Sequence, residues 1–185
     1  MMMPSRRFVL SLAAAIVALA LALPALAKLS LSGGKEVSFH AVGPAGLAIE
    51  GKGRDVKLHE NGKEIAIVVG LNSIKTGIGL RDRHMKEKYL ETHKYPNATL
   101  RVAKSKIQFP SGGKAVKTAS SGKLTLHGVT RPVKFNYRAS GSENRASVEG
   151  DLHVKMTEYG IEVPSYLGVS VKPDVDIAVK FQVVK

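Results

Sequence analysis

The chain has 185 residues, a formal net charge of +13 and no cysteine, which excludes disulfides, thiolate catalysis and metal sites with cysteine ligands. A basic chain invites a nucleic-acid interpretation, but the lysines stand singly, Trp is absent and no base-stacking motif occurs, so we expect no nucleic-acid partner. The charge instead indicates a solvated basic exterior. The alternative, which is a more specific hypothesis, is attraction of this exterior to an anionic membrane surface.

The chain opens with the pattern of a secretory signal peptide over residues 1–27. Arg6-Arg7 forms the basic start, Phe8–Leu23 is an apolar run, and Ala25-Leu26-Ala27 supplies a small-residue cleavage site. A retained anchor is the alternative, but the apolar run falls short of the about 20 residues that span a bilayer. We therefore expect cleavage, one mature domain over residues 28–185, and a periplasmic or secreted location.

Most of the mature part alternates apolar and polar residues with the period of two that is typical of β-strands. Asn61-Gly62 favours a tight hairpin turn with positive φ at both central residues. The pattern predicts about eight or nine short strands in one all-β domain, and alternation alone leaves a barrel and a sandwich open. The predicted strands lie at residues 35–41, 47–49, 56–58, 65–71, 99–109, 124–126, 133–139, 148–154 and 175–183.

The stretch Leu71–Leu100 interrupts this alternation with a dense run of charged residues. It predicts a helix over about Leu80–Glu91, with Asp82 as the N-terminal cap. Met85 and Tyr89 are four residues apart, so they would share one face of that helix. We expect this apolar face to pack on the sheet or over the mouth of a barrel.

Two segments stand out as motifs. The first is SIKTGIGLRDRHM at residues 73–85, followed by YLETHKYPNATL at residues 89–100, and the second is GKLTLHGVTRPVKF at residues 122–135. Together they resemble the YceI-like, polyisoprenoid-binding family of exported proteins. The resemblance covers roughly Leu29 to Val184. It implies a lipocalin-like, antiparallel, eight-stranded β-barrel with one or two short helices. It further implies a long apolar channel that holds an isoprenoid-type lipid, and no catalytic activity.

The inward apolar faces of the predicted strands are candidates for the lining of such a channel, with plain core packing as the alternative for each of them. An aliphatic lining suits a flexible apolar chain, because each buried CH₂ contributes about 0.8 kcal/mol without directional demand. The candidate channel residues are Phe39, Ile65, Ile67, Val69, Val133, Phe135, Tyr137, Val148, Leu152, Ile177, Val179 and Phe181.

Three polar residues are candidates for contact with a ligand head group: Arg81, His84 and Arg131. The alternative for Arg81 is structural, since an arginine beside Asp82 at a helix start can pin the helix to the barrel. No serine lies in a nucleophile-elbow sequence, so we predict no catalytic residue. The six histidines are scattered without the spacing of a zinc site, so we predict no metal.

These observations favour an exported, non-enzymatic protein that holds an isoprenoid-like or other amphiphilic lipid in a barrel channel. The alternative is a barrel with a filled interior that acts as a basic stress or surface-interaction protein. The expected partners are the lipid itself and an anionic membrane surface, with no cofactor besides the lipid. The oligomeric state stays open, a dimer included.

Overall fold

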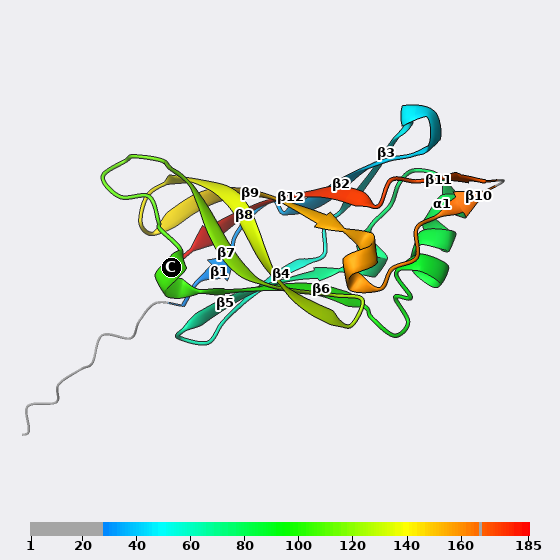
Figure 1. Ribbon diagram of the computed structural model, residues 1–185. Coiled ribbons are helices and arrows are strands. Elements are labelled where there is room, and N and C mark those ends of the chain that lie inside the picture. Colours follow the sequence, from blue (N-terminus) through cyan, green and yellow to red (C-terminus); the bar gives the residue numbers. More distant parts are fainter. Residues whose placement is uncertain (1–27, 167) are drawn as a thin grey trace, which may run out of the picture.

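The computed structural model describes residues 28–166 and 168–185, so the predicted signal peptide lies outside the described residues. Its main feature is an antiparallel sheet of ten strands that curls into a nearly closed barrel (Figure 1). The order is β3-β2-β12-β9-β8-β7-β6-β5-β4, with β1 also paired to β12. The strands are β1 Ser30–Leu31, β2 Glu36–Val42, β3 Ala48–Gly53, β4 Val56–Glu60, β5 Glu64–Gly70, β6 Asn97–Ala103, β7 Val116–Leu126, β8 Val129–Gly141, β9 Arg145–Lys155 and β12 Asp174–Val184.

The antiparallel barrel confirms the predicted fold class, whereas the predicted number of eight strands is corrected to ten. One reason is that two strands share one side of β12. There β2 pairs with Val175–Lys180, and the two-residue β1 pairs with Val183 and Val184. A separate small hairpin, β10 Ser165–Tyr166 with β11 Val169–Ser170, lies outside the main sheet.

The barrel closes between β4 and the edge formed by β1 and β2 through side chains. The backbone N–H of Leu29 donates to Glu60 Oε2 at 2.7 Å, and Lys35 Nζ donates to the carbonyl of Val56 at 2.7 Å. A two-residue bridge between Lys52 and Lys75 ties β3 to the connection that follows β5. This seam therefore depends on a few polar contacts.

The predicted helix over about Leu80–Glu91 is present as α1, Gly79–His84, followed by one π-helical turn, Met85–Tyr89. Its N-cap position belongs to Ile78, which makes no side-chain capping bond. The prediction that Asp82 caps the helix is wrong. Asp82 lies within the first turn, and its Oδ1 accepts from the backbone N–H of Thr76 at 2.7 Å.

The described part of the chain also contains four short 3₁₀ turns, at Pro44–Gly46, Leu71–Ser73, Lys104–Lys106 and Met156–Tyr159. The β4–β5 hairpin also differs in detail from its prediction. The loop has three residues, and only Gly62 has a positive φ, of 81°. This suits a three-residue loop, in which a glycine takes the left-handed position.

The two ends of the barrel differ (Figure 1). At one, here called the helical end, lie α1 and the β10–β11 hairpin; at the other, the terminal end, lie β1 and the C-terminal residue. A large apolar cluster extends from Leu71, Leu126 and Tyr159 at the helical end into the barrel, where it includes Phe135 and Tyr137. A smaller cluster around Leu29 and Phe181 packs towards the terminal end. No helix in the described ranges has the length and apolar character needed to cross a bilayer.

Candidate functional site

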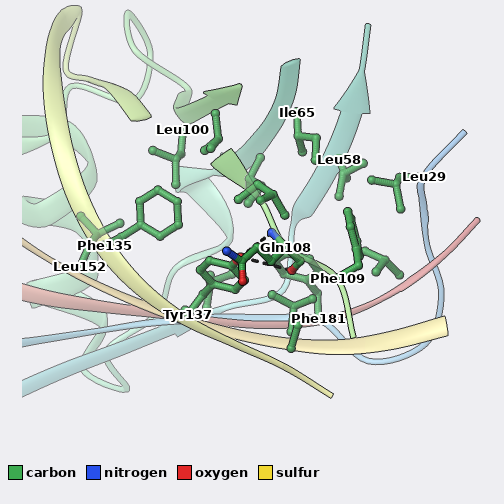
Figure 2. Close-up of a pocket in the computed structure, with 18 of the residues that line it drawn as sticks. Leu29, Leu58, Ile65, Leu100, Gln108, Phe109, Phe135, Tyr137, Leu152 and Phe181 are labelled. Carbon is green, nitrogen blue, oxygen red and sulfur yellow. Dashed lines mark hydrogen bonds between the residues drawn. The ribbon is translucent and has the colours of Figure 1, made fainter. Parts of the chain in front are cut away.

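An apolar cavity lies inside the barrel, towards the terminal end. Its lining comes from β4, β5, β6, β8, β9 and β12, since alternate side chains along a strand point to the same face of a sheet. Further lining comes from Leu29, just before β1, and from residues 107–109 in the connection after β6. Figure 2 shows side chains from these separate elements facing a common space.

Eight of the twelve predicted channel residues line this cavity: Ile65, Ile67, Phe135, Tyr137, Val148, Leu152, Val179 and Phe181. The other four do not line it: Phe39, Val69, Val133 and Ile177. Phe39, Val133 and Ile177 pack instead against the large cluster of the helical end. The interior is therefore hollow towards one end and filled towards the other, a division that strand alternation cannot show.

The prediction missed other lining residues. Leu58, Leu100 and Val102 lie on predicted strands, so the same alternation could have found them. Ile107 and Phe109 were assigned to a strand over residues 99–109, but β6 ends at Ala103. Nothing in the local sequence indicates that the chain after β6 turns back over the interior.

The cavity is small and almost wholly apolar. Its volume is about 80 Å³, and one water needs about 10–15 Å³. The cavity therefore has room for on the order of six waters, which suits a short hydrocarbon segment rather than a long chain. Gly150 lines it as well, and a Cβ there would lie 3.5 Å from Val179 Cγ1, an ordinary contact distance.

The wall of the cavity is irregular between β6 and β7. β7 pairs with β8 along its full length, Val116–Leu126, whereas it pairs with β6 only through Lys123–Thr125. The edge of β7 over residues 116–122 is thus not paired with β6. The segment Lys104–Pro110, here called the wall segment, covers this gap, and its Ile107 and Phe109 line the cavity.

Side chains hold the wall segment in place. The hydroxyl of Tyr137 accepts from the backbone N–H of Gln108 at 2.7 Å and donates to the carbonyl of the same residue at 3.2 Å (Figure 2). Ser120 Oγ donates to the carbonyl of Lys106 at 2.9 Å, and Lys106 Nζ donates to Ser121 Oγ at 2.9 Å. Tyr137 is buried, with 5% of its surface exposed, so its hydroxyl joins the segment from the inside of the barrel.

Basic side chains stand beside the cavity at the terminal end. A shallow second hollow shares Leu29, Phe109 and Val183 with the cavity, and its charged lining residues are Glu143, Arg145 and Lys185. Lys185 Nζ lies 4.8 Å from the centroid of the Phe109 ring, within the range of a cation–π contact.

The predicted head-group residues lie away from the cavity, and none of the three lines it. Arg81 donates from Nε to Thr76 Oγ1 and from Nη2 to the Thr76 carbonyl, both at 2.9 Å. Arg131 Nε donates to the carbonyl of Glu158 at 2.5 Å, and His84 is exposed on α1. The structure does not bring these three together with the apolar lining.

A polar cluster joins the helical segment to the β7–β8 turn. His127 Nε2 lies 2.9 Å from Glu91 Oε2, and its Nδ1 lies 3.2 Å from the Tyr159 carbonyl. Glu91 and His127 both have positive φ, of 42° and 50°, which non-glycine residues rarely adopt. Hydrogen bonds from Lys94 and His127 hold the pKa of Glu91 below its usual value. These hydrogen bonds hold the end of the helical segment against the β7–β8 turn.

Two observations bear on whether the cavity could support chemistry, one on Asp151 and one on metal binding. Asp151 lines it in part, but its Oδ2 accepts from Asn136 Nδ2 at 3.0 Å on the exposed side of the sheet. Across residues 28–166 and 168–185, no three His, Asp or Glu side chains gather closely enough to hold a metal ion.

Comparison with known proteins gives the same fold and a family. Residues 35–183 match the family model described as a YceI-like domain. A UPF0312 protein of Yersinia enterocolitica is 30% identical over 105 residues, and one of Pseudomonas paraeruginosa is 31% identical over 107 residues. These matches cover 53% and 54% of this chain and 52% and 53% of the relatives, so the chain spans about half the length of the curated relatives that it matches.

Solved structures share the fold at low identity. A polyisoprenoid-binding domain from Saccharophagus degradans superposes with a TM-score of 0.69 at 18% identity, over 84% of this chain and 97% of that one. BcnA of Burkholderia cenocepacia superposes with a TM-score of 0.63 at 16% identity, over 80% and 95% of the two chains.

Proposed function

The chain belongs to the YceI-like family, and from that premise we propose that it is an exported, non-enzymatic protein that holds the apolar chain of an isoprenoid-like or other amphiphilic lipid inside its barrel. In this proposal residues 1–27 are removed on export, and residues 28–185 form the lipid-binding domain in the periplasm or outside the cell. The fold neighbour from Saccharophagus degradans, which is described as a polyisoprenoid-binding domain, supports the ligand class.

The observation that carries the proposal is the apolar cavity. Its lining consists of aliphatic and aromatic side chains apart from Gln108, Gly150 and Asp151, and the hydroxyl of Tyr137 makes both of its hydrogen bonds to Gln108. A hydrocarbon segment enclosed there gains free energy from each buried CH₂ and needs no polar partner. Such a site selects for apolar, flexible ligands and offers no activated nucleophile for chemistry.

The polar head of the ligand then lies at the terminal end. The hollow beside the cavity presents two basic side chains, Arg145 and Lys185, and one acid, Glu143, so its side chains carry a net positive charge that favours an anionic head group. Arg81, His84 and Arg131 remain the candidates only for a ligand that reaches the opposite, helical end.

The test fills the cavity from within. Gly150→Leu places a branched side chain in the lining, whereas Gly150→Ala adds only a methyl group for which there is room, and so serves as the matched control. The mature protein is purified, extracted with organic solvent and analysed by mass spectrometry. We expect a long-chain lipid in stoichiometric amount from the wild type and Gly150→Ala, and its loss from Gly150→Leu at unchanged fold by circular dichroism.

Two results would contradict the proposal. One is repeated recovery of lipid-free wild-type protein that takes up no added prenol. The other is equal lipid content in Gly150→Leu and Gly150→Ala, which would place the lipid outside the cavity.

The second candidate function is that of a ligand-free surface-interaction protein. The observation in its favour is that large apolar side chains are exposed at Leu47, Ile78, Leu80 and Val169. Lipid-free protein that still binds membranes or another partner through these residues would support it.

A further inference from the structure

The wall segment Lys104–Pro110 closes the cavity, yet it belongs to neither of the strands beside it. Among the described residues, no backbone hydrogen bond joins residues 105–110 to β7. The gap is instead bridged by hydroxyl groups of Tyr137, Ser120 and Ser121. A sheet strand is held by a ladder of backbone bonds, so this part of the barrel separates at a lower cost than any paired strand.

The wall segment also occupies the space that a longer ligand would need. Ile107 and Phe109 are half-buried, and both face the cavity, while the side chain of Gln108 is exposed. With these two side chains in place, the cavity accommodates only a short hydrocarbon segment. If Ile107 and Phe109 move outwards, the apolar surface of a ligand can take over the contacts that these two side chains make with the rest of the cavity lining.

Tyr137 is the side chain that couples the segment to the interior. Its ring lines the cavity, and its hydroxyl bonds both the N–H and the carbonyl of Gln108. A ligand that displaces the segment must break both bonds, whereas a ligand that fits the existing space breaks neither.

From these contacts we infer that the wall segment is a displaceable part of the barrel, and that Tyr137 determines the length of the ligand by fixing its position. This inference rests on the proposed function and specifies it: short prenyl chains bind the closed barrel, and long ones bind only after displacement. Only molecules with a displaced wall segment bind long chains, so the apparent affinity for long chains is reduced in proportion to the fraction that is open. The affinity for short chains does not depend on this opening.

The first experiment removes the hydroxyl alone. Tyr137→Phe keeps the ring, and Tyr159→Phe is the matched control because Tyr159 is also buried but does not line the cavity. Retention of geraniol and geranylgeraniol after gel filtration is measured by mass spectrometry. We expect Tyr137→Phe to raise the ratio of retained geranylgeraniol to geraniol about tenfold, as the loss of two hydrogen bonds in the closed state implies, and Tyr159→Phe to leave it unchanged.

The second experiment locks the segment. The chain has no cysteine, so Lys106→Cys with Ser121→Cys creates a unique pair. The Lys106 side chain reaches the Ser121 hydroxyl, and a bifunctional thiol reagent of that span can join the two positions. Crosslinking should abolish retention of geranylgeraniol and preserve that of geraniol, and the untreated variant is the control.

Each outcome decides between the proposals. A crosslinked protein that holds geranylgeraniol as before, or an equal effect of Tyr137→Phe on both prenols, overturns the displaceable wall while lipid binding stands. A wild type that retains neither prenol overturns the proposed function and this inference together.

Discussion

Glu60 connects three parts of the chain at the terminal end. Its carboxylate forms an ion pair with Lys104, where the wall segment begins, and accepts from the backbone N–H of Leu29 at 2.7 Å. Only 6% of the side chain is exposed. Burial works to raise the pKa of Glu60, but the hydrogen bonds from Lys104 and Leu29 outweigh it, so the pKa lies below its usual value.

The lowered pKa of Glu60 makes the folded protein less stable as the pH falls in the acid range. The carboxylate is more acidic in the folded than in the unfolded chain, so its stabilising contribution is present above the ordinary pKa of 4.5 and is lost as the pH falls through the folded value. Glu60→Gln keeps an acceptor for Leu29 but loses the charge, and should lower the free energy of unfolding by about 1–3 kcal/mol at neutral pH.

Urea unfolding of Glu60→Gln and the wild type measures this difference, and the two should converge in acid. A difference that persists after the carboxylate is protonated would show that the amide disturbs packing instead. Glu36→Gln, at an exposed pair with Lys52, is the control and should change little.

Single residues also show where inference from sequence stops. Glu60 is 31 positions from Leu29 and 44 from Lys104, so no local pattern could predict their contact. Arg81 and Asp82 were recognisable as a polar pair, but their common partner, Thr76, decides that they brace the start of the helix.

At the scale of elements, the approach of β6 to β7 depends on a glycine of the second sequence motif. A Cβ on Gly122 would lie 2.5 Å from the carbonyl oxygen of Arg101, which is backbone and cannot move aside cheaply. The short ladder between the two strands begins beside this contact, at Arg101 and Lys123.

Gly122→Ala should therefore destabilise the protein by about 1–3 kcal/mol, the usual range for a strained backbone contact. Gly150→Ala, on β9, is the matched control and should be close to neutral because its Cβ meets only ordinary contacts. Thermal unfolding of both variants checks this. Equal melting temperatures would mean that β6 shifts away from β7 without cost.

Alternation predicted strands where one face is apolar and inward and the other is polar and outward, as in β12 and β8. It did not predict the end of β6, since Ile107 and Phe109 alternate with Gln108 just as strand residues do. Their departure from the sheet follows from contacts with Tyr137 and Ser120, which lie far along the chain. The cavity wall was thus the part of the site that the sequence could not show.

At the scale of the whole molecule, the exposed large apolar side chains are not spread evenly. Leu47 follows the turn between β2 and β3, Ile78 and Leu80 lie at the start of α1, and Val169 is on β11. All of these segments lie at the helical end (Figure 1). Lys75 and Arg83 are exposed close to Ile78 and Leu80 in sequence, on a chain that is strongly basic overall.

This arrangement suits an anionic membrane surface. Each basic residue near such a surface contributes about 1 kcal/mol, and apolar side chains enter the interface. We expect the mature protein to sediment with vesicles of phosphatidylcholine and phosphatidylglycerol, but not with phosphatidylcholine alone. Ile78→Ser with Leu80→Ser, or Lys75→Glu with Arg83→Glu, should weaken sedimentation at least about tenfold.

Lys117→Glu with Lys134→Glu is the control, because it makes the same change of charge on the outer face of β7 and β8. An equal loss in this control would mean that only total charge matters and that the helical end has no special role. Concentration-dependent dimers that disappear in Ile78→Ser with Leu80→Ser would identify a second copy of the chain as the partner.

The short β6–β7 ladder has one more consequence, which concerns self-association. Whenever the wall segment moves out, β7 presents a bare edge over residues 116–122, and an unpaired edge is a template for strands of other molecules. Lys117 and Lys123 stand at the two ends of that edge, where their mutual repulsion between copies hinders such pairing. If the wall segment moves out to admit a ligand, these lysines therefore keep the open molecules from associating with one another.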